Sequence, residues 1–320
     1  MSKLKRPSGM LFLRVVLFFS GIGICVFLIH KYLPAFQTIE KFSDLPVYPH
    51  GLLAFILFTL HVVLVFYAWH FSLILVEIEV SLKNSVGIFL TSLITRYIPG
   101  GVWHLGSRLL AMSRLGKSTY LVGITLFLEQ MAALLVCILL TCLFFMLELF
   151  FFPDTVFVSG QISLMSKIVG LVAGCGLLII LYPPFFRRSL TWLYKRVKKQ
   201  QFKPSLSSQG LYTLYGIHAL SLLVYALGYY QVLCIVVEQA MPPSLIVIGV
   251  VLLSTLLGFL APFVPGGIGI RESVIVVLLM PFVGATDATA MALLGRIVIV
   301  FVEFILFFGV IASYQVVSHD

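Results

Sequence analysis

The 320-residue chain is 61% hydrophobic and only 10% charged, whereas soluble domains are roughly 45–50% apolar. This composition excludes a soluble globular protein and indicates helices that span a bilayer. The formal net charge of +9 does not indicate nucleic-acid binding, because most Lys and Arg residues lie in short loops or next to the lipid surface. No stretch is long and polar enough for a separate soluble domain. Residues 1–320 are therefore predicted to form a single integral membrane domain with an all-α fold.

In chain order, the apolar runs predict six spanning helices, at residues 10–30, 52–76, 119–149, 161–182, 211–237 and 288–313. The first run follows three basic residues, as in a signal peptide. Its length of about twenty residues and the lack of an A-x-A-like site favour an uncleaved span instead.

Two apolar hairpins lie between these spans, at residues 85–114 and 244–283, and each is interrupted by a Pro-Gly-Gly sequence. Each arm of the first hairpin has roughly 13 residues, or about 20 Å of helix, which is too short for a hydrocarbon core about 30 Å thick. We therefore expect this hairpin to enter and leave the membrane on one side. In the second hairpin, the run 244–264 is long enough to cross.

The positions of the basic residues predict the orientation of the chain. The loop 183–210 contains seven Lys or Arg residues and no Asp or Glu, and the N-terminus and the flanks of the first hairpin are also basic. With six spans and two re-entrant hairpins, all these clusters lie on the cytoplasmic side, as do both termini. We expect a multi-pass protein of the cell membrane, whether an inner or a plasma membrane.

This orientation makes the first hairpin open from the cytoplasm and the second from the opposite face. The order of span, broken hairpin and span then occurs twice in opposite senses, in repeat-like halves at about 52–149 and 211–313. Such an inverted repeat is typical of transporters, whose substrates bind at broken helices. The sequences around the two breaks match weakly, so coincidental helix-breaking turns remain the alternative.

Four arginines lie within or beside the broken elements: Arg96, Arg108, Arg271 and Arg296. Left in lipid, they would together cost roughly 10–14 kcal/mol, so they must face a polar interior, a carboxylate or an anionic ligand. The carboxylates available are Glu129, Glu272 and Glu303.

The spacing of these charges limits how they can pair. Arg296 and Glu303 are seven residues apart and share a helical face, whereas the adjacent Arg271 and Glu272 point apart and need different partners. Two interpretations stay open and are compatible. In one, the charges form internal ion pairs that fasten the bundle; in the other, some of them line a cavity for a lipid headgroup.

Arginine suits a headgroup cavity because its planar fork binds phosphate through two hydrogen bonds and stays charged. Glycines at the start of a return helix add free backbone N–H groups, where the helix dipole also favours an anion. The predicted substrate-binding residues are Arg96, Tyr97, Pro99, Gly100, His104, Arg108, Glu129, Pro265, Gly266, Gly267, Gly269, Arg271, Glu272, Arg296 and Glu303.

The histidines and cysteines predict no metal or cofactor site. His61 and His70 are nine residues apart on one predicted span, which favours interior hydrogen bonding over metal binding or a proton relay. The five cysteines all fall inside apolar runs and are expected to be buried free thiols.

At these residues the chain resembles a known family. Pro262-x-x-Pro265-Gly-Gly-x-Gly269-x-Arg271-Glu272 is similar to a signature of the lysylphosphatidylglycerol synthase transmembrane-region family, a flippase-like domain. Arg96-Tyr97-Ile98-Pro99-Gly100, with Trp103 and Arg108, resembles its upstream Tyr-x-Pro-Gly motif. Glu129 and Arg296 also lie where the family commonly has them, and the similarity covers about residues 50–312.

The resemblance implies movement of polar or charged-headgroup lipids between leaflets, such as aminoacylated phospholipids, hopanoids or polyprenyl-linked sugars. In one departure, Glu129 is followed by Gln130 where the family often has Glu-Arg. The soluble aminoacyltransferase domain is absent from this sequence, so the family's name is not expected to describe an activity here.

The leading hypothesis is a lipid flippase or lipid-transport protein that is not an enzyme and whose partners are membrane lipids. One alternative is a membrane-embedded enzyme that modifies lipids, although no Ser/His/Asp, H-E-x-x-H or paired-Asp constellation is visible. Another is a partner subunit of a separate glycosyl- or aminoacyltransferase. No P-loop is present to supply energy, so movement would be passive or coupled to an ion through Glu129, Glu272 or Glu303.

Overall fold

A computed structural model describes residues 47–98, 103–151, 188, 207–237, 244–261 and 265–316. Every regular element in these residues is a helix, which confirms the all-α prediction. The elements are α2 (Val47–Leu75), α3 (Leu82–Thr95), α4 (Trp103–Arg114), α5 (Thr119–Phe151), α8 (Ser208–Val236), α9 (Ser244–Phe259), the short 3-10 helix η1 (Pro265–Gly267) and α10 (Ile270–Val316). The predicted spans 10–30 and 161–182 and most of the basic loop 183–210 lie outside the described residues.

Four of the described helices are long and apolar enough to cross a membrane: Pro49–Leu75, Thr119–Glu148, Ser208–Val236 and Ile270–Gly309. They coincide with four of the six predicted spans. The last is not one continuous helix, because Gly284 has φ 84° and ψ 160° and Pro281 removes a backbone donor just before it. Residues 270–283 thus form a return arm and residues 285–316 form the final span.

The arms of both predicted hairpins are helical, and they are short. At 1.5 Å per residue, the 14 residues of α3 and the 16 residues of α9 extend only about 21 and 24 Å. Because α9 ends at Phe259, the run 244–264 does not form a single helix, which answers the question that its length had left open. In the first hairpin, the Thr95 and Ser107 hydroxyl oxygens lie 3.1 Å apart and join the two arms.

Helices α2 and α8 run antiparallel to one another along their whole lengths. His50 Nδ1 lies 2.8 Å from Gln231 Oε1 near one end, and at the other end Gly210 leaves space for the Leu75 side chain. Both helices have 29 residues, and each precedes a broken hairpin. An inverted-topology repeat requires this antiparallel relationship between equivalent helices.

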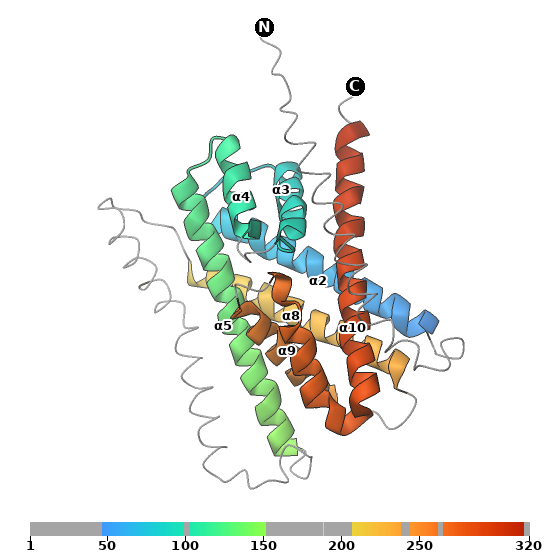
Figure 1. Cartoon of the computed structure of the whole chain (residues 1–320). Coiled ribbons are helices and arrows are strands. Elements are labelled where there is room, and N and C mark those ends of the chain that lie inside the picture. Colours follow the sequence, from blue (N-terminus) through green and yellow to red (C-terminus); the bar gives the residue numbers. More distant parts are fainter. Residues whose placement is uncertain are drawn as a thin grey trace.

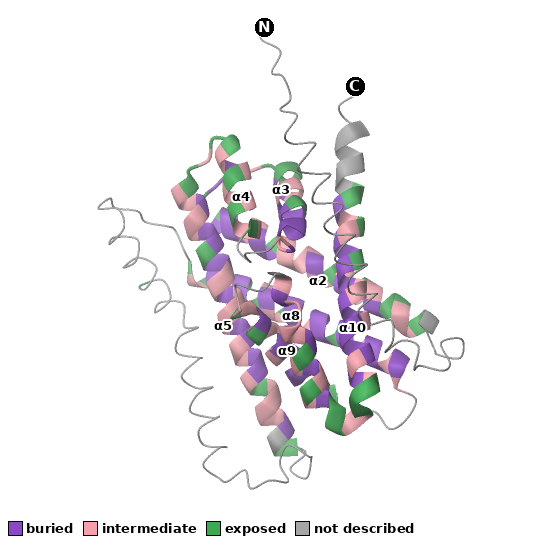
Figure 2. Cartoon of the chain, in the orientation of Figure 1, coloured by how far each residue is buried: buried purple, intermediate pink, exposed green. Residues whose placement is uncertain are grey.

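The two hairpins lie at opposite ends of the molecule, and their broken tips point towards its middle (Figure 1). Helices α2 and α8 cross the molecule obliquely between them. Buried residues concentrate in this central region, whereas exposed residues lie on the outer faces (Figure 2). Many exposed side chains are large and apolar, including Phe301 and Val277, as expected where a helix faces lipid.

Candidate functional site where the two hairpins meet

Glu303 on the final span holds the tip of the first hairpin. Its Oε2 accepts a 2.8 Å hydrogen bond from the Tyr97 hydroxyl, and its Oε1 lies 3.2 Å from Nη1 of Arg96. The Glu303 side chain is only 3% exposed. A buried carboxylate needs this compensation, so the contact fixes the break of the first hairpin against a helix of the second half.

Arg296, two turns earlier on the same helix, holds the tip of the second hairpin. Its Nη2 donates a 2.7 Å hydrogen bond to the carbonyl oxygen of Gly266. The guanidinium carbon lies 5.8 Å from the centre of the Tyr97 ring, within the range of a cation–π interaction. A methyl group added at Gly266 would lie 2.8 Å from Arg296 Nη2 and 3.5 Å from the Tyr97 ring. The two breaks therefore meet at Arg296.

Glu272, in the first turn of the return arm, fills the position predicted for a bound anion. Its Oε2 accepts a 2.6 Å hydrogen bond from the backbone N–H of Gly269, and its Oε1 lies 3.6 Å from Nε of Arg296. A carboxylate is stabilised at this place by the helix dipole and the free N–H groups. The site predicted for a lipid phosphate is thus occupied by a carboxylate of the chain itself.

Arg271 differs from the other three predicted arginines because no carboxylate among the described residues pairs with it. Its Nε is buried and has no hydrogen-bond partner among them. The side chain lies between two glycines: a methyl group would come within 2.5 Å of Nε at Gly258 and within 2.9 Å at Gly267. The absence of a side chain at these two glycines thus leaves the space that Arg271 occupies.

The charges around the two breaks do not balance. Arg96, Arg271 and Arg296 face two carboxylates, Glu272 and Glu303, so one positive charge is in excess among the described residues. Arg271 carries this excess, in an environment where an unpaired charge is costly. The arrangement is suited to an anionic ligand.

The first half has its own buried ion pair, between the return arm and the following span. Arg108 Nη1 donates to both oxygens of Glu129, at 2.9 and 3.2 Å, and Arg108 Nε donates to Ser92 Oγ at 2.8 Å. The guanidinium lies 4.9 Å from the ring centre of Trp69 and 4.7 Å from that of Phe89. This pair fits the interpretation of an ion pair that fastens the bundle.

The comparison with protein families identifies the group to which this architecture belongs. The family model for the lysylphosphatidylglycerol synthase TM region matches residues 11–306. The chain belongs to the lysylphosphatidylglycerol synthase TM-region family. A comparison with curated proteins finds no match.

Membership of this family makes the chain a membrane protein of lipid metabolism or transport. The resemblance seen in the sequence is confirmed, and the match begins upstream of the predicted limit of residue 50 and ends at residue 306, before residue 312. Both breaks and all of the predicted site residues fall inside the matched region.

The remaining predicted residues of this lysylphosphatidylglycerol synthase TM-region protein are placed less fully. Pro99 and Gly100 lie outside the described residues, and Pro265 is described in its backbone as the start of η1. His104 is half-buried in the first turn of α4, and its carbonyl oxygen accepts a 3.0 Å hydrogen bond from Ser107.

The two histidines of α2 make the interior hydrogen bonds that the sequence favours. His61 Nδ1 lies 2.9 Å from the hydroxyl and 3.0 Å from the carbonyl oxygen of Ser221, and His70 Nδ1 lies 3.0 Å from Ser85 Oγ. These contacts join α2 to α8 and to α3, so both histidines are part of the packing.

Several residues that support the site were not predicted from the sequence. Tyr229 occupies the space left by Gly295 and lies within electrostatic range of Arg296 and Glu272. Tyr225 and Tyr229 are four residues apart in a buried span, and their ring centres are 5.1 Å apart. Two tyrosines on one face of an apolar helix indicate a polar partner for their hydroxyl groups. This pattern could have identified both residues from the sequence.

Proposed function

We propose that this protein transports lipids with an anionic or polar headgroup between the two membrane leaflets, without changing them chemically. Suitable lipids are phospholipids, aminoacyl-phospholipids, hopanoids and polyprenyl-linked sugars. The observation that carries the proposal is the contact of two broken hairpins, from opposite ends of the molecule, at Arg296. In this proposal each break opens to one face of the membrane, and a short stretch of polar contacts lies between the two, as in transporters built from inverted repeats.

The excess positive charge at Arg271 supports a headgroup that carries a phosphate. A guanidinium binds phosphate through charge-assisted hydrogen bonds, which are about twice as strong as those between neutral groups. Lipid phosphates are the anions available in the bilayer. Arg271 lies beside the second break, between Gly258 and Gly267, where a headgroup that passes the break would meet it.

The two tips are held by different chemistry, which supports alternating opening. The first tip is held by the carboxylate of Glu303 and the second by the guanidinium of Arg296. An anionic headgroup competes with the carbonyl oxygen of Gly266 for Arg296, so a lipid itself weakens the second contact. A ligand shifts such an equilibrium by its different affinity for the two states.

Transport of this kind runs down a gradient unless it is coupled to an ion. We propose that consumption of the lipid by a separate glycosyl- or aminoacyltransferase supplies the gradient. The protein acts in the cell membrane with both termini in the cytoplasm, as its basic loops predict.

Leaflet exchange in reconstituted vesicles tests the proposal. A fluorescent phosphatidylglycerol is added to both leaflets, and an impermeant reductant measures how fast the inner pool becomes accessible. Arg271→Gln is expected to slow exchange by roughly tenfold or more, since a charged hydrogen bond contributes about 1.5–3 kcal/mol. Arg114→Gln, at the exposed end of α4, is the matched control and should keep the original rate.

Undiminished exchange in folded Arg271→Gln protein would contradict the assigned role of this arginine. Absence of exchange with the unaltered protein, for phospholipids and for the other lipid classes alike, would contradict transport itself. Mass spectrometry of the vesicle lipids before and after incubation separates transport from catalysis, because a new lipid species would indicate an enzyme.

A further inference from the structure

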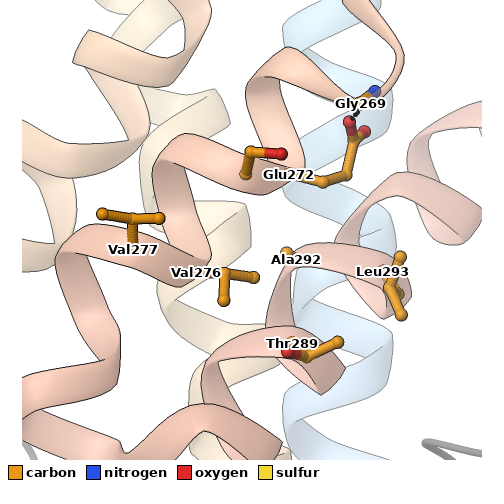
Figure 3. Close-up of a pocket in the computed structure, with 8 residues that line it drawn as sticks. Gly269, Glu272, Val276, Val277, Thr289, Ala292 and Leu293 are labelled. Atoms are coloured by element: carbon orange, nitrogen blue, oxygen red, sulfur yellow. Dashed lines mark hydrogen bonds between the residues drawn. The ribbon is translucent and has the colours of Figure 1, made fainter.

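A crevice of about 220 Å³ separates the return arm of α10 from the final span. Its walls are formed by residues of both segments (Figure 3). The lining residues are Gly269, Glu272, Ser273, Val276, Val277, Thr289, Ala292 and Leu293. The crevice therefore lies within the second hairpin and its following span, next to the break.

The crevice is apolar along most of its length and polar at one end. Val276, Val277 and Leu293 form apolar walls, and Glu272 lies at the end nearest Gly269 and the break (Figure 3). The hydroxyl of Thr289 donates a hydrogen bond to the carbonyl oxygen of Ala285. Val277 is 56% exposed and lies on the short apolar return arm, residues 270–283. An exposed apolar wall of this kind suits the acyl chains of a lipid, and the polar end suits its headgroup.

Glu272 connects this crevice to the charged contacts at the break. The residue is buried, and its Oε1, which lies 3.6 Å from Arg296 Nε, accepts no hydrogen bond among the described residues. Its other oxygen, Oε2, accepts a hydrogen bond from the backbone N–H of Gly269. A phosphate would seek these same partners, an arginine and a free N–H at the start of a helix.

We propose that this crevice is the lateral entry site for a phospholipid and that Glu272 is an exchangeable counter-ion there. The lipid enters from the bilayer between the two segments of α10. Its phosphate then displaces the Glu272 carboxylate from Arg296. This inference rests on the proposed transport function and adds the route and the binding contact by which the lipid reaches the break.

Site-specific photocrosslinking tests this inference with the full chain in vesicles. A benzoylphenylalanine replaces Val277 at the mouth of the crevice. In the matched control it replaces Met280, which lies on the same arm, is 45% exposed and does not line the crevice. The vesicles contain phosphatidylglycerol and the uncharged digalactosyl diacylglycerol, and mass spectrometry identifies the crosslinked lipid. At position 277 we expect phosphatidylglycerol adducts in excess of its share of the bilayer, and at position 280 adducts in proportion to it.

Two further substitutions test the role of the carboxylate. Glu272→Gln keeps the size and the hydrogen bond to Gly269 but removes the competing charge, so the excess of phosphatidylglycerol at position 277 should rise several-fold. Arg296→Gln should reduce the share of phosphatidylglycerol among the adducts at position 277 to its share of the bilayer. If Arg296→Gln protein does not fold, the comparison of positions 277 and 280 and the Glu272→Gln variant still decide the question.

Adducts in bilayer proportion at position 277 would overturn the entry site, and an unchanged or smaller excess in Glu272→Gln would overturn the exchange. Suppression of the excess by inorganic phosphate would assign the site to free phosphate instead of lipid. Leaflet exchange measured on the same protein keeps the two proposals apart. Intact exchange without the excess contradicts only the entry site, whereas the excess without exchange contradicts only the transport function.

Discussion

Tyr97 and Glu303 lie 206 positions apart in the sequence and share a buried hydrogen bond of 2.8 Å. This bond joins the break of the first hairpin to the final span. Arg296 on the same span holds the break of the second hairpin through Gly266. One helix therefore holds both breaks, through two residues that lie two turns apart.

Tyr97→Phe is expected to destabilise the closed first hairpin while the fold is kept. The phenyl ring retains the packing, but Glu303 Oε2 loses its donor, and a buried acceptor without a partner costs about 1–3 kcal/mol. A lower unfolding temperature in detergent measures this effect. Tyr212→Phe, at an exposed position on α8, should leave the unfolding temperature unchanged, and equal temperatures for both variants would contradict the contact.

The ion pair of Arg108 and Glu129 should show the asymmetry of a buried charge pair. Arg108→Met or Glu129→Leu alone leaves one buried charge without its partner and is expected to cost about 3–5 kcal/mol. The double variant removes both charges, and Ser92 keeps its hydrogen bond to the carbonyl oxygen of Phe89. Its loss of stability should therefore be clearly smaller than the sum of the two single losses.

Unfolding temperatures of the three variants in the same detergent complete this double-mutant cycle. Additive losses would show that the two side chains contribute independently, and would contradict the structural role assigned to the pair.

The sequence predicts the helices well, because short, apolar arms with Pro-Gly-Gly between them have few alternatives in a membrane. The four described spans and the arms of both hairpins fall close to the predicted residues. For the run 244–264, the sequence left open whether the segment crosses the membrane. Its composition alone does not reveal that the helix ends at Phe259, where close packing of Gly258 against Gly267 and Arg271 replaces helical continuation.

The sequence also identifies most of the charged residues at the breaks but not their partners. Spacing places Arg296 and Glu303 on one face, yet their partners, Gly266 and Tyr97, come from different hairpins. Such pairings depend on how distant helices cross, which one sequence does not specify. Local geometry is recovered better: the adjacent Arg271 and Glu272 do have different surroundings, as their side-chain directions require.

Cysteine labelling tests whether the two hairpins open on opposite faces. Ser118 is exposed between α4 and α5, and Thr286 is exposed just after Gly284. The connection between α4 and α5 and the turn within α10 lie at opposite ends of the molecule (Figure 1). In a background with all five native cysteines replaced by alanine, an impermeant maleimide should label Thr286→Cys in intact cells. Ser118→Cys, next to the basic Arg114 and Lys117, should react only after the cells are permeabilised.

Labelling of both positions from the same side would contradict opposite openings and with them the inverted repeat. Labelling of Ser118→Cys alone in intact cells would keep the repeat but reverse the predicted orientation.

Gly258→Ala is expected to displace the Arg271 side chain while the fold is kept. The added methyl group would lie 2.5 Å from Nε and 2.6 Å from Cγ of Arg271, which is too close for either atom, so the side chain must leave the space between the hairpin arms. Leaflet exchange of phosphatidylglycerol is then expected to fall to the rate of Arg271→Gln.

Gly216→Ala is the matched control, because nothing lies within 4 Å of a methyl group there; in a helix this change stabilises by up to about 1 kcal/mol. Combining Gly258→Ala with Arg271→Gln should cause no further loss, since both changes remove the same guanidinium from the same place. A further large drop in the double variant would show that Gly258 acts through the packing of α9 instead of through Arg271.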